Sequence, residues 1–131
     1  MKKCFLLILV LFQLISISST AQSSSCRAVR TGTFKVVSKE SGTTLIKRGT
    51  KFQTEINKDL GVEIILSIKW TSSCSYELRP VKLVKGDPAM MGDGKTVITT
   101  KIKNITKHSY IAETSMTGSD VAIQFQVEIL D

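Results

Sequence analysis

Apolar and polar residues alternate along most of this chain, and a period of two is what a β-strand with one buried face requires. The alternation is clearest over residues 62–70, where Val62, Ile64, Leu66, Ile68 and Trp70 share one face of the expected strand. No segment repeats its apolar residues with the period of about 3.6 that an amphipathic helix needs. The sequence therefore predicts eight strands, at residues 32–38, 43–48, 51–57, 62–70, 74–84, 97–105, 109–115 and 121–129.

Short turns rich in Gly, Ser, Asn and Asp separate these strands, and such residues suit tight turns. Strands joined by short turns form antiparallel pairs with their neighbours in the chain. The fold is therefore expected to be an all-β, up-and-down meander. Each strand has one polar face, and the sheet must curl to cover the other. We therefore expect closure into a small barrel or a strongly bent sheet. A two-sheet β-sandwich is the alternative.

The first 21 residues have the pattern of a secretory signal peptide. Lys2 and Lys3 form a positive start, an apolar run follows, and Ser19, Thr20 and Ala21 offer a cleavage site of small residues. The run is too short for a membrane span, which needs about 20 apolar residues. Cleavage leaves 110 residues, a polar lead-in at 22–30 and one β domain at 31–131. The protein is expected to be exported to the periplasm, the outer-membrane surface or the extracellular space.

Removal of Lys2 and Lys3 lowers the net charge from +7 to +5, and a moderate positive charge is ordinary for a soluble domain. The chain contains no run of five like charges, so it lacks the basic tail of many nucleic-acid-binding proteins. Several basic residues nevertheless gather in the second half, where they offer a surface for an anionic glycan or protein partner. These residues are Lys69, Arg79, Lys82, Lys85, Lys101, Lys103 and Lys107.

Two cysteines remain once Cys4 leaves with the signal peptide. An even pair in an oxidising compartment is expected to form a disulfide, here between Cys26 and Cys74. The alternative is a lipoprotein in which Cys26 becomes the acylated first residue. Ser23 stands where such a site usually has an aliphatic residue, and acylation would leave Cys74 without a partner.

Residues that could carry catalysis or bind a metal are sparse. His108 is the only histidine, and it lies at an expected turn. Two cysteines are too few for a zinc site, and the loop at 85–95 lacks the ligand spacing of a calcium-binding loop. We therefore expect no enzymatic activity, no cofactor and no metal. Met90 and Met91 in this loop either line a ligand entrance or fold over an open barrel end.

A set of residues is spread over nearly all of the expected mature chain: Cys26, residues 31–35, Arg48, Gln53, Glu55, Trp70, residues 74–76, Tyr110 and residues 118–120. In this combination the chain resembles a group of small exported proteins of flavobacteria and their relatives. The group has no established activity, and its members are often labelled "DNA topoisomerase IV". This chain is too short for that activity and carries no nucleotide-binding motif. The resemblance implies a small β-rich exported domain and transfers no functional residues.

The expected architecture favours a non-enzymatic, lipocalin-like module that holds a small apolar or amphipathic ligand, because an eight-stranded barrel has room for one. Its alternative is a structural or interaction protein of the cell envelope. The aromatic pair of Trp70 and Tyr76 either stacks on the ligand or plugs the core beside the disulfide. The candidate ligand-lining residues are Phe34, Phe52, Trp70, Tyr76, Tyr110 and Phe125.

Overall fold

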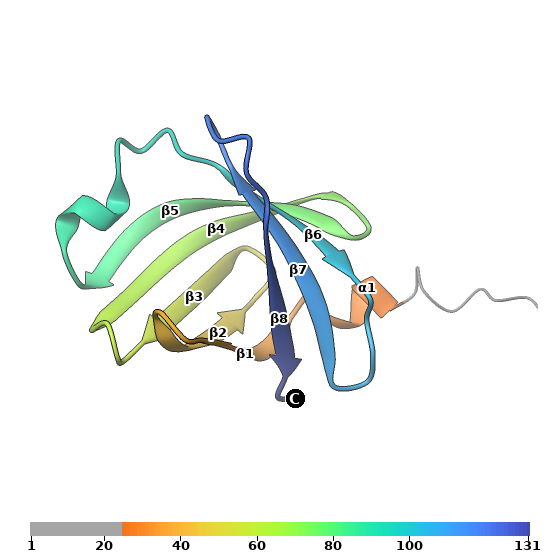
Figure 1. Ribbon diagram of the computed structural model, residues 1–131. Coiled ribbons are helices and arrows are strands. Elements are labelled where there is room, and N and C mark those ends of the chain that lie inside the picture. Colours follow the sequence, from red (N-terminus) through yellow and green to blue (C-terminus); the bar gives the residue numbers. More distant parts are fainter. Residues whose placement is uncertain (1–24) are drawn as a thin grey trace, which may run out of the picture.

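The computed structural model describes residues 25–131, in which eight antiparallel strands close into a barrel (Figure 1). The expected signal peptide at 1–21 lies outside the described residues. The elements in chain order are α1 (Ser25–Ala28), β1 (Gly32–Ser38), β2 (Gly42–Arg48), β3 (Phe52–Asn57), β4 (Val62–Ser72), β5 (Ser75–Lys85), the 3-10 helix η1 (Pro88–Met91), β6 (Ile98–Lys103), β7 (Ser109–Met116) and β8 (Ile123–Ile129).

Each strand pairs with the next along the chain, and β1 pairs with β8 to close the barrel. At the closure, Phe34 faces Ile129 and Lys35 faces Glu128. The prediction of an all-β, up-and-down meander that closes into a small barrel is confirmed, and the chain does not form the alternative sandwich. Closure leaves few unpaired strand edges, because every strand has a neighbour on both sides over part of its length.

The two ends of the barrel differ. At one end, α1 is tied to the turn between β4 and β5 by a disulfide between Cys26 and Cys74. Cys26 and Val29 are each only 2% exposed, so the segment expected as a polar lead-in contains a helical turn that plugs this end. We call it the capped end. The opposite end carries the β1–β2 turn, the β3–β4 turn and the long loop with η1, and we call it the open end.

Strand β5 widens the barrel at the open end. Its first residues, Ser75 to Leu78, pair with β6, whereas the rest of the strand pairs only with β4. Two register shifts accompany this separation, and Pro80 lies opposite Leu66 at one of them. Proline cannot donate a ladder hydrogen bond, and it is tolerated where a strand has a free edge. Strands β5 and β6 therefore diverge toward the open end.

Strand β3 turns its polar face inward, which corrects one prediction. Gln53 is 1% exposed and lies opposite the buried Leu66 of β4, whereas Phe52 lies on the outer face and is 51% exposed. Residues directly opposite in an antiparallel pair point to the same side of the sheet. Phe52 is therefore not a ligand-lining residue. The inner face of β3 instead carries Gln53, Glu55 and Asn57, because the buried guanidinium of Arg48 on β2 needs oxygen acceptors.

Candidate functional site

Arg48 lies in the barrel interior, 4% exposed, at the last position of β2. Its Nε donates to Gln53 Oε1 at 2.7 Å, and its Nη1 donates to the backbone carbonyl of Val29 at 2.7 Å. Its Nη2 donates to the hydroxyls of Tyr76 and Tyr110 at 3.0 Å and 3.1 Å. Oxygen atoms from four different segments thus accept from one guanidinium, which compensates the cost of burying its charge.

Aromatic rings complete the surroundings of this guanidinium. Its central carbon lies 4.6 Å from the ring centroid of Phe34 and 4.8 Å from that of Tyr76, so both rings make cation–π contacts. Phe34 also packs edge-on against Tyr110, with ring centroids 5.8 Å apart. Arg48 and these rings form a layer across the barrel, between the capped end and the rest of the interior.

Glu55 continues the polar network on the side away from the capped end. Because Arg48 donates to the carbonyl oxygen of Gln53, the amide group of Gln53 is oriented with its nitrogen toward Glu55, and Nε2 donates to Glu55 Oε1 at 2.8 Å. Burial raises the pKa of the Glu55 carboxyl above its usual value, against the opposing effects of the Gln53 hydrogen bond and the Arg48 charge. Burial likewise raises the pKa of the Tyr76 hydroxyl above its ordinary value, against the opposing charge of Arg48.

A cavity of about 270 Å³ occupies the barrel interior between the layer of Arg48 and its aromatic neighbours and the open end. Ser38, Ser41 and Gly42 at the β1–β2 turn border it, so the cavity reaches the open end. Glu55 and Arg48 are the charged residues along its wall. Threonine hydroxyls add polar groups. The apolar part of the wall is formed by Val36, Ile46, Leu78, Ile98, Ala112, Phe125 and Val127.

Small inward-facing residues leave this space. Ala112 of β7 and Thr100 of β6 are buried, and Thr114 lies beside them with its hydroxyl 3.1 Å from that of Thr100. Larger side chains at these positions would fill the interior. The cavity is slightly smaller than the roughly 300–1,000 Å³ that is usual for pockets that hold drug-sized ligands. It suits a molecule of modest size with both apolar and polar parts.

Three of the six aromatic candidates line this cavity: Tyr76, Tyr110 and Phe125. Phe34 is buried beneath the cavity, where it contacts Arg48. Trp70 lies near the capped end, with its ring 4.9 Å from that of Tyr76 and the guanidinium of Arg30 at 4.8 Å. Of the two roles predicted for the Trp70–Tyr76 pair, the structure therefore places Trp70 in the core packing near the disulfide.

The sequence singles out the polar residues of the site, Arg48, Gln53 and Glu55, only through the resemblance, which assigns them no function. A local signal for them exists in the sequence. Arg48 and Gln53 flank a short turn that contains Gly49, and a hairpin of that length places them opposite one another, as the structure has them. An arginine that faces inward must find acceptors, which would have indicated the polar face of β3 as the inner one.

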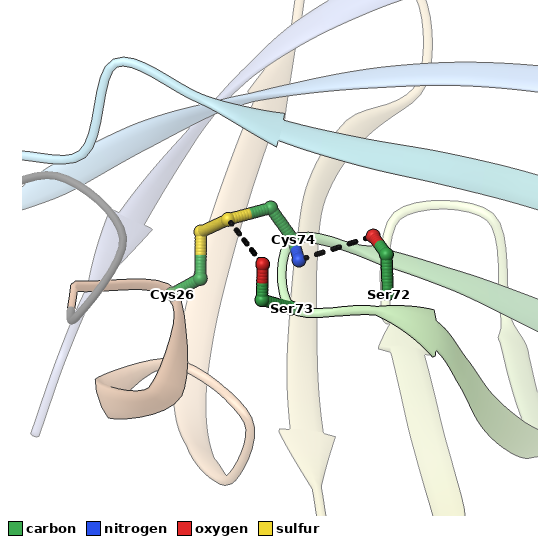
Figure 2. The surroundings of a disulfide bond; sticks show 4 residues. All are labelled: Cys26, Ser72, Ser73 and Cys74. Atoms are coloured by element: carbon green, nitrogen blue, oxygen red, sulfur yellow. Dashed lines mark hydrogen bonds between the residues drawn. A yellow bond between two sulfur atoms is a disulfide. The ribbon is translucent and has the colours of Figure 1, made fainter.

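The disulfide between Cys26 and Cys74 is confirmed, with Cα atoms 5.3 Å apart. Figure 2 shows the bridge from α1 to the β4–β5 turn, where the backbone nitrogen of Cys74 donates to Ser72 Oγ at 3.4 Å. The Ser73 hydroxyl lies 3.8 Å from the sulfur of Cys74. The bridge uses the sulfur of Cys26 that acylation would need, so it supports the disulfide over the lipoprotein alternative.

Comparisons with family models, with curated proteins and with solved structures found no match. Within residues 25–131, no helix is both long and apolar enough to cross a membrane. In the same part of the chain, no three His, Cys, Asp or Glu side chains gather closely enough to hold a metal ion.

Replacement of Glu55 by glutamine is expected to stabilise the protein at neutral pH. The raised pKa means that the folded state binds the Glu55 proton more tightly than the unfolded state does. Ionisation of Glu55 therefore lowers the free energy of unfolding as the pH rises from the ordinary value of 4.5 through the raised one. Urea denaturation at neutral pH should show a gain for Glu55→Gln, and the gain should vanish below pH 4.5.

Glu128→Gln is the matched control for this prediction. Glu128 pairs with Lys35 at 3.3 Å on the outer face, where its side chain is 54% exposed, so its substitution should change stability by less than about 1 kcal/mol. A Glu55→Gln variant that is less stable than the parent at neutral pH would contradict the assigned direction of the Glu55 pKa shift.

Proposed function

We propose that this protein is a non-enzymatic binding module that holds a small amphipathic molecule inside its barrel, in a lipocalin-like manner. The observation that carries the proposal is the cavity of about 270 Å³, which has an apolar wall, reaches the open end and contains the carboxyl of Glu55. An eight-stranded barrel either fills its interior with side chains or leaves room for one small ligand.

A binding role explains why the interior is not filled. Protein interiors are packed about as densely as organic crystals, and side chains that line an unfilled space forgo part of their packing contacts. The cavity also contains a carboxyl group whose ionisation is unfavourable, so two features of the same region oppose stability. Functional sites commonly retain such costs. A ligand that fills the cavity and contacts its polar groups would offset both.

The proposed place of action is outside the cytoplasm. Disulfides persist in oxidising compartments, and the bridge between Cys26 and Cys74 suits the periplasm, the outer-membrane surface or the extracellular space. The expected signal peptide supports the same location.

The outer surface favours this proposal over contact with an anionic partner. Acidic residues stand among the basic ones: Arg79 pairs with Glu77 at 3.4 Å, and Lys103 pairs with Glu113 at 2.6 Å. Lys69 also lies directly opposite Glu77 in the β4–β5 ladder. A surface of mixed sign attracts an anionic glycan or protein only weakly.

Replacement of Ala112 by phenylalanine is expected to abolish ligand binding, because the new ring enters the cavity. The measurement is a titration of isotope-labelled protein with 1-hexanol, followed by NMR. In the parent protein, saturable shifts should gather on the methyl groups of Ile46, Leu78 and Val127, which line the cavity. In Ala112→Phe, the apparent affinity should fall at least about tenfold, since one ring displaces most of a ligand of this size.

Ser115→Phe places the same ring on the same strand but on the outer face, where Ser115 lies opposite Thr99. This control should bind 1-hexanol as the parent does. Native mass spectrometry of the protein purified from its own host should in addition show a bound small molecule. Absence of saturable 1-hexanol binding in the parent, together with a ligand-free mass spectrum, would overturn the proposed function.

A further inference from the structure

We infer that the cavity selects small amphipathic molecules that carry a protonated amine, with the ammonium group bound by the carboxylate of Glu55 and the apolar part against the opposite wall. This inference rests on the proposed function and names the chemical class of its ligand.

Arg48 is poorly placed to bind an anionic head group. A guanidinium has five N–H donors, and four hydrogen bonds already connect this one to protein oxygens. Two aromatic rings lie against it as well. The remaining charged residue of the cavity wall is Glu55, and its charge would repel a carboxylate or phosphate ligand.

Glu55 has one oxygen free for a ligand. Its Oε1 accepts from Gln53, whereas its Oε2 accepts no hydrogen bond from any residue in the described part of the chain. No ion pair in that part reaches Glu55 directly, since Gln53 stands between its carboxyl and Arg48. Glu55 is half-buried, and a carboxylate withdrawn from water that lacks a cation in contact is costly. An ammonium group supplies both the opposite charge and the donor.

The surroundings of Glu55 also suit the other donors of an ammonium group, which carries three. Ser41 and Thr44 border a second, smaller hollow together with Glu55. Thr44 Oγ1 already accepts from Asn57 at 3.1 Å, but a hydroxyl oxygen has two lone pairs, so both hydroxyls can accept from an ammonium group. The side chains of Leu78, Phe125 and Val127 supply apolar contact for the rest of the molecule. The other charged and titratable groups around Glu55 are the guanidinium of Arg48 and the hydroxyls of Tyr76 and Tyr110, so Glu55 is the only acidic residue along the described cavity wall.

The experiment compares three probes of similar size, hexylamine, 1-hexanol and hexanoate, by NMR titration near neutral pH. An alkylamine is protonated there, because its pKa is close to that of lysine, about 10.4. Hexylamine is expected to bind at least about tenfold more tightly than 1-hexanol, as a hydrogen bond between charged groups should provide. In Glu55→Gln the ratio of the two affinities should fall to about one, while Glu128→Gln on the outer face should keep the parent ratio.

The outcomes separate this inference from the proposed function. Saturable binding of 1-hexanol with no preference for hexylamine would overturn the amine selectivity and leave the binding module intact. Tighter binding of hexanoate, or an amine preference that survives Glu55→Gln, would also overturn it. If none of the three probes binds, the amine selectivity is wrong, and a ligand-free native mass spectrum would then overturn the binding module as well. The amide spectrum of Glu55→Gln reports whether that variant is folded, so loss of selectivity is distinguished from loss of structure.

Discussion

Replacement of Arg48 by methionine is expected to lower the free energy of unfolding by about 3–5 kcal/mol, because several buried acceptors would lose their donor at a cost of about 1–3 kcal/mol each. Methionine fills part of the same apolar space but donates no hydrogen bond. The Gln53 carbonyl, the Val29 carbonyl and two tyrosine hydroxyls lose a donor that now lies 2.7–3.1 Å away. Urea denaturation followed by circular dichroism measures the loss.

Two further variants test which property of Arg48 matters: one keeps its charge but not the geometry of the guanidinium, and the other removes an exposed arginine. Arg48→Lys keeps the charge, but a single ammonium cannot reach acceptors in four directions, so we expect an intermediate loss of stability. Arg79→Met removes an arginine whose side chain is 58% exposed and paired with Glu77, and it should cost less than about 1 kcal/mol. An Arg48→Met protein within 1 kcal/mol of the Arg79→Met protein would show that the network contributes little.

The strands were predictable because their signals are local. Alternation and short turns depend on residues that are close in the chain, and the up-and-down order follows from short connections. Strand β4 illustrates this, since Leu66 and Ile68 are buried on the face that the alternation indicates. Closure of the meander into a barrel then follows from the need to cover one apolar face on every strand.

The orientation of β3 was not predictable from hydrophobicity alone. Phe52, Thr54 and Ile56 form the more apolar face of that strand, yet the structure turns Gln53 and Glu55 inward. The deciding interaction is between strands, because Arg48 of β2 is buried and Gln53 lies directly opposite it. A buried guanidinium without acceptors would cost more than the exposure of one phenylalanine ring.

The cavity depends on small residues, which carry no local signal of their own. The candidate ligand-lining residues are all large aromatic residues, and three of them, Tyr76, Tyr110 and Phe125, line the cavity. The same criterion includes Trp70, but Trp70 lies near the capped end. Ala112 and Thr100 create the space, but alanine and threonine on a strand are ordinary in any β protein. Their role becomes visible only when the closed barrel places them on the same interior surface.

Replacement of both Cys26 and Cys74 by alanine is expected to lower the free energy of unfolding by about 4 kcal/mol in the chain-entropy account of a disulfide. The two cysteines are separated by 48 residues, so the bridge closes a long loop in the unfolded chain. The bridge also holds α1, whose neighbour Val29 offers its carbonyl to Arg48 at 2.7 Å. Loss of the bridge therefore weakens the Arg48 network too, and the effects of the cysteine and arginine substitutions should not be additive.

Reduction of the parent protein provides the matched measurement. A strong reductant should lower its melting temperature to that of the Cys26→Ala, Cys74→Ala variant, and it should leave the variant unchanged. Circular dichroism below the transition should show the same strand content in all samples, because the barrel ladders do not pass through the bridge. The mass of the intact protein decides its covalent state directly, and two free thiols or an acylated Cys26 would contradict the bridge. A melting temperature that does not change with reductant would contradict the contribution of the bridge to stability.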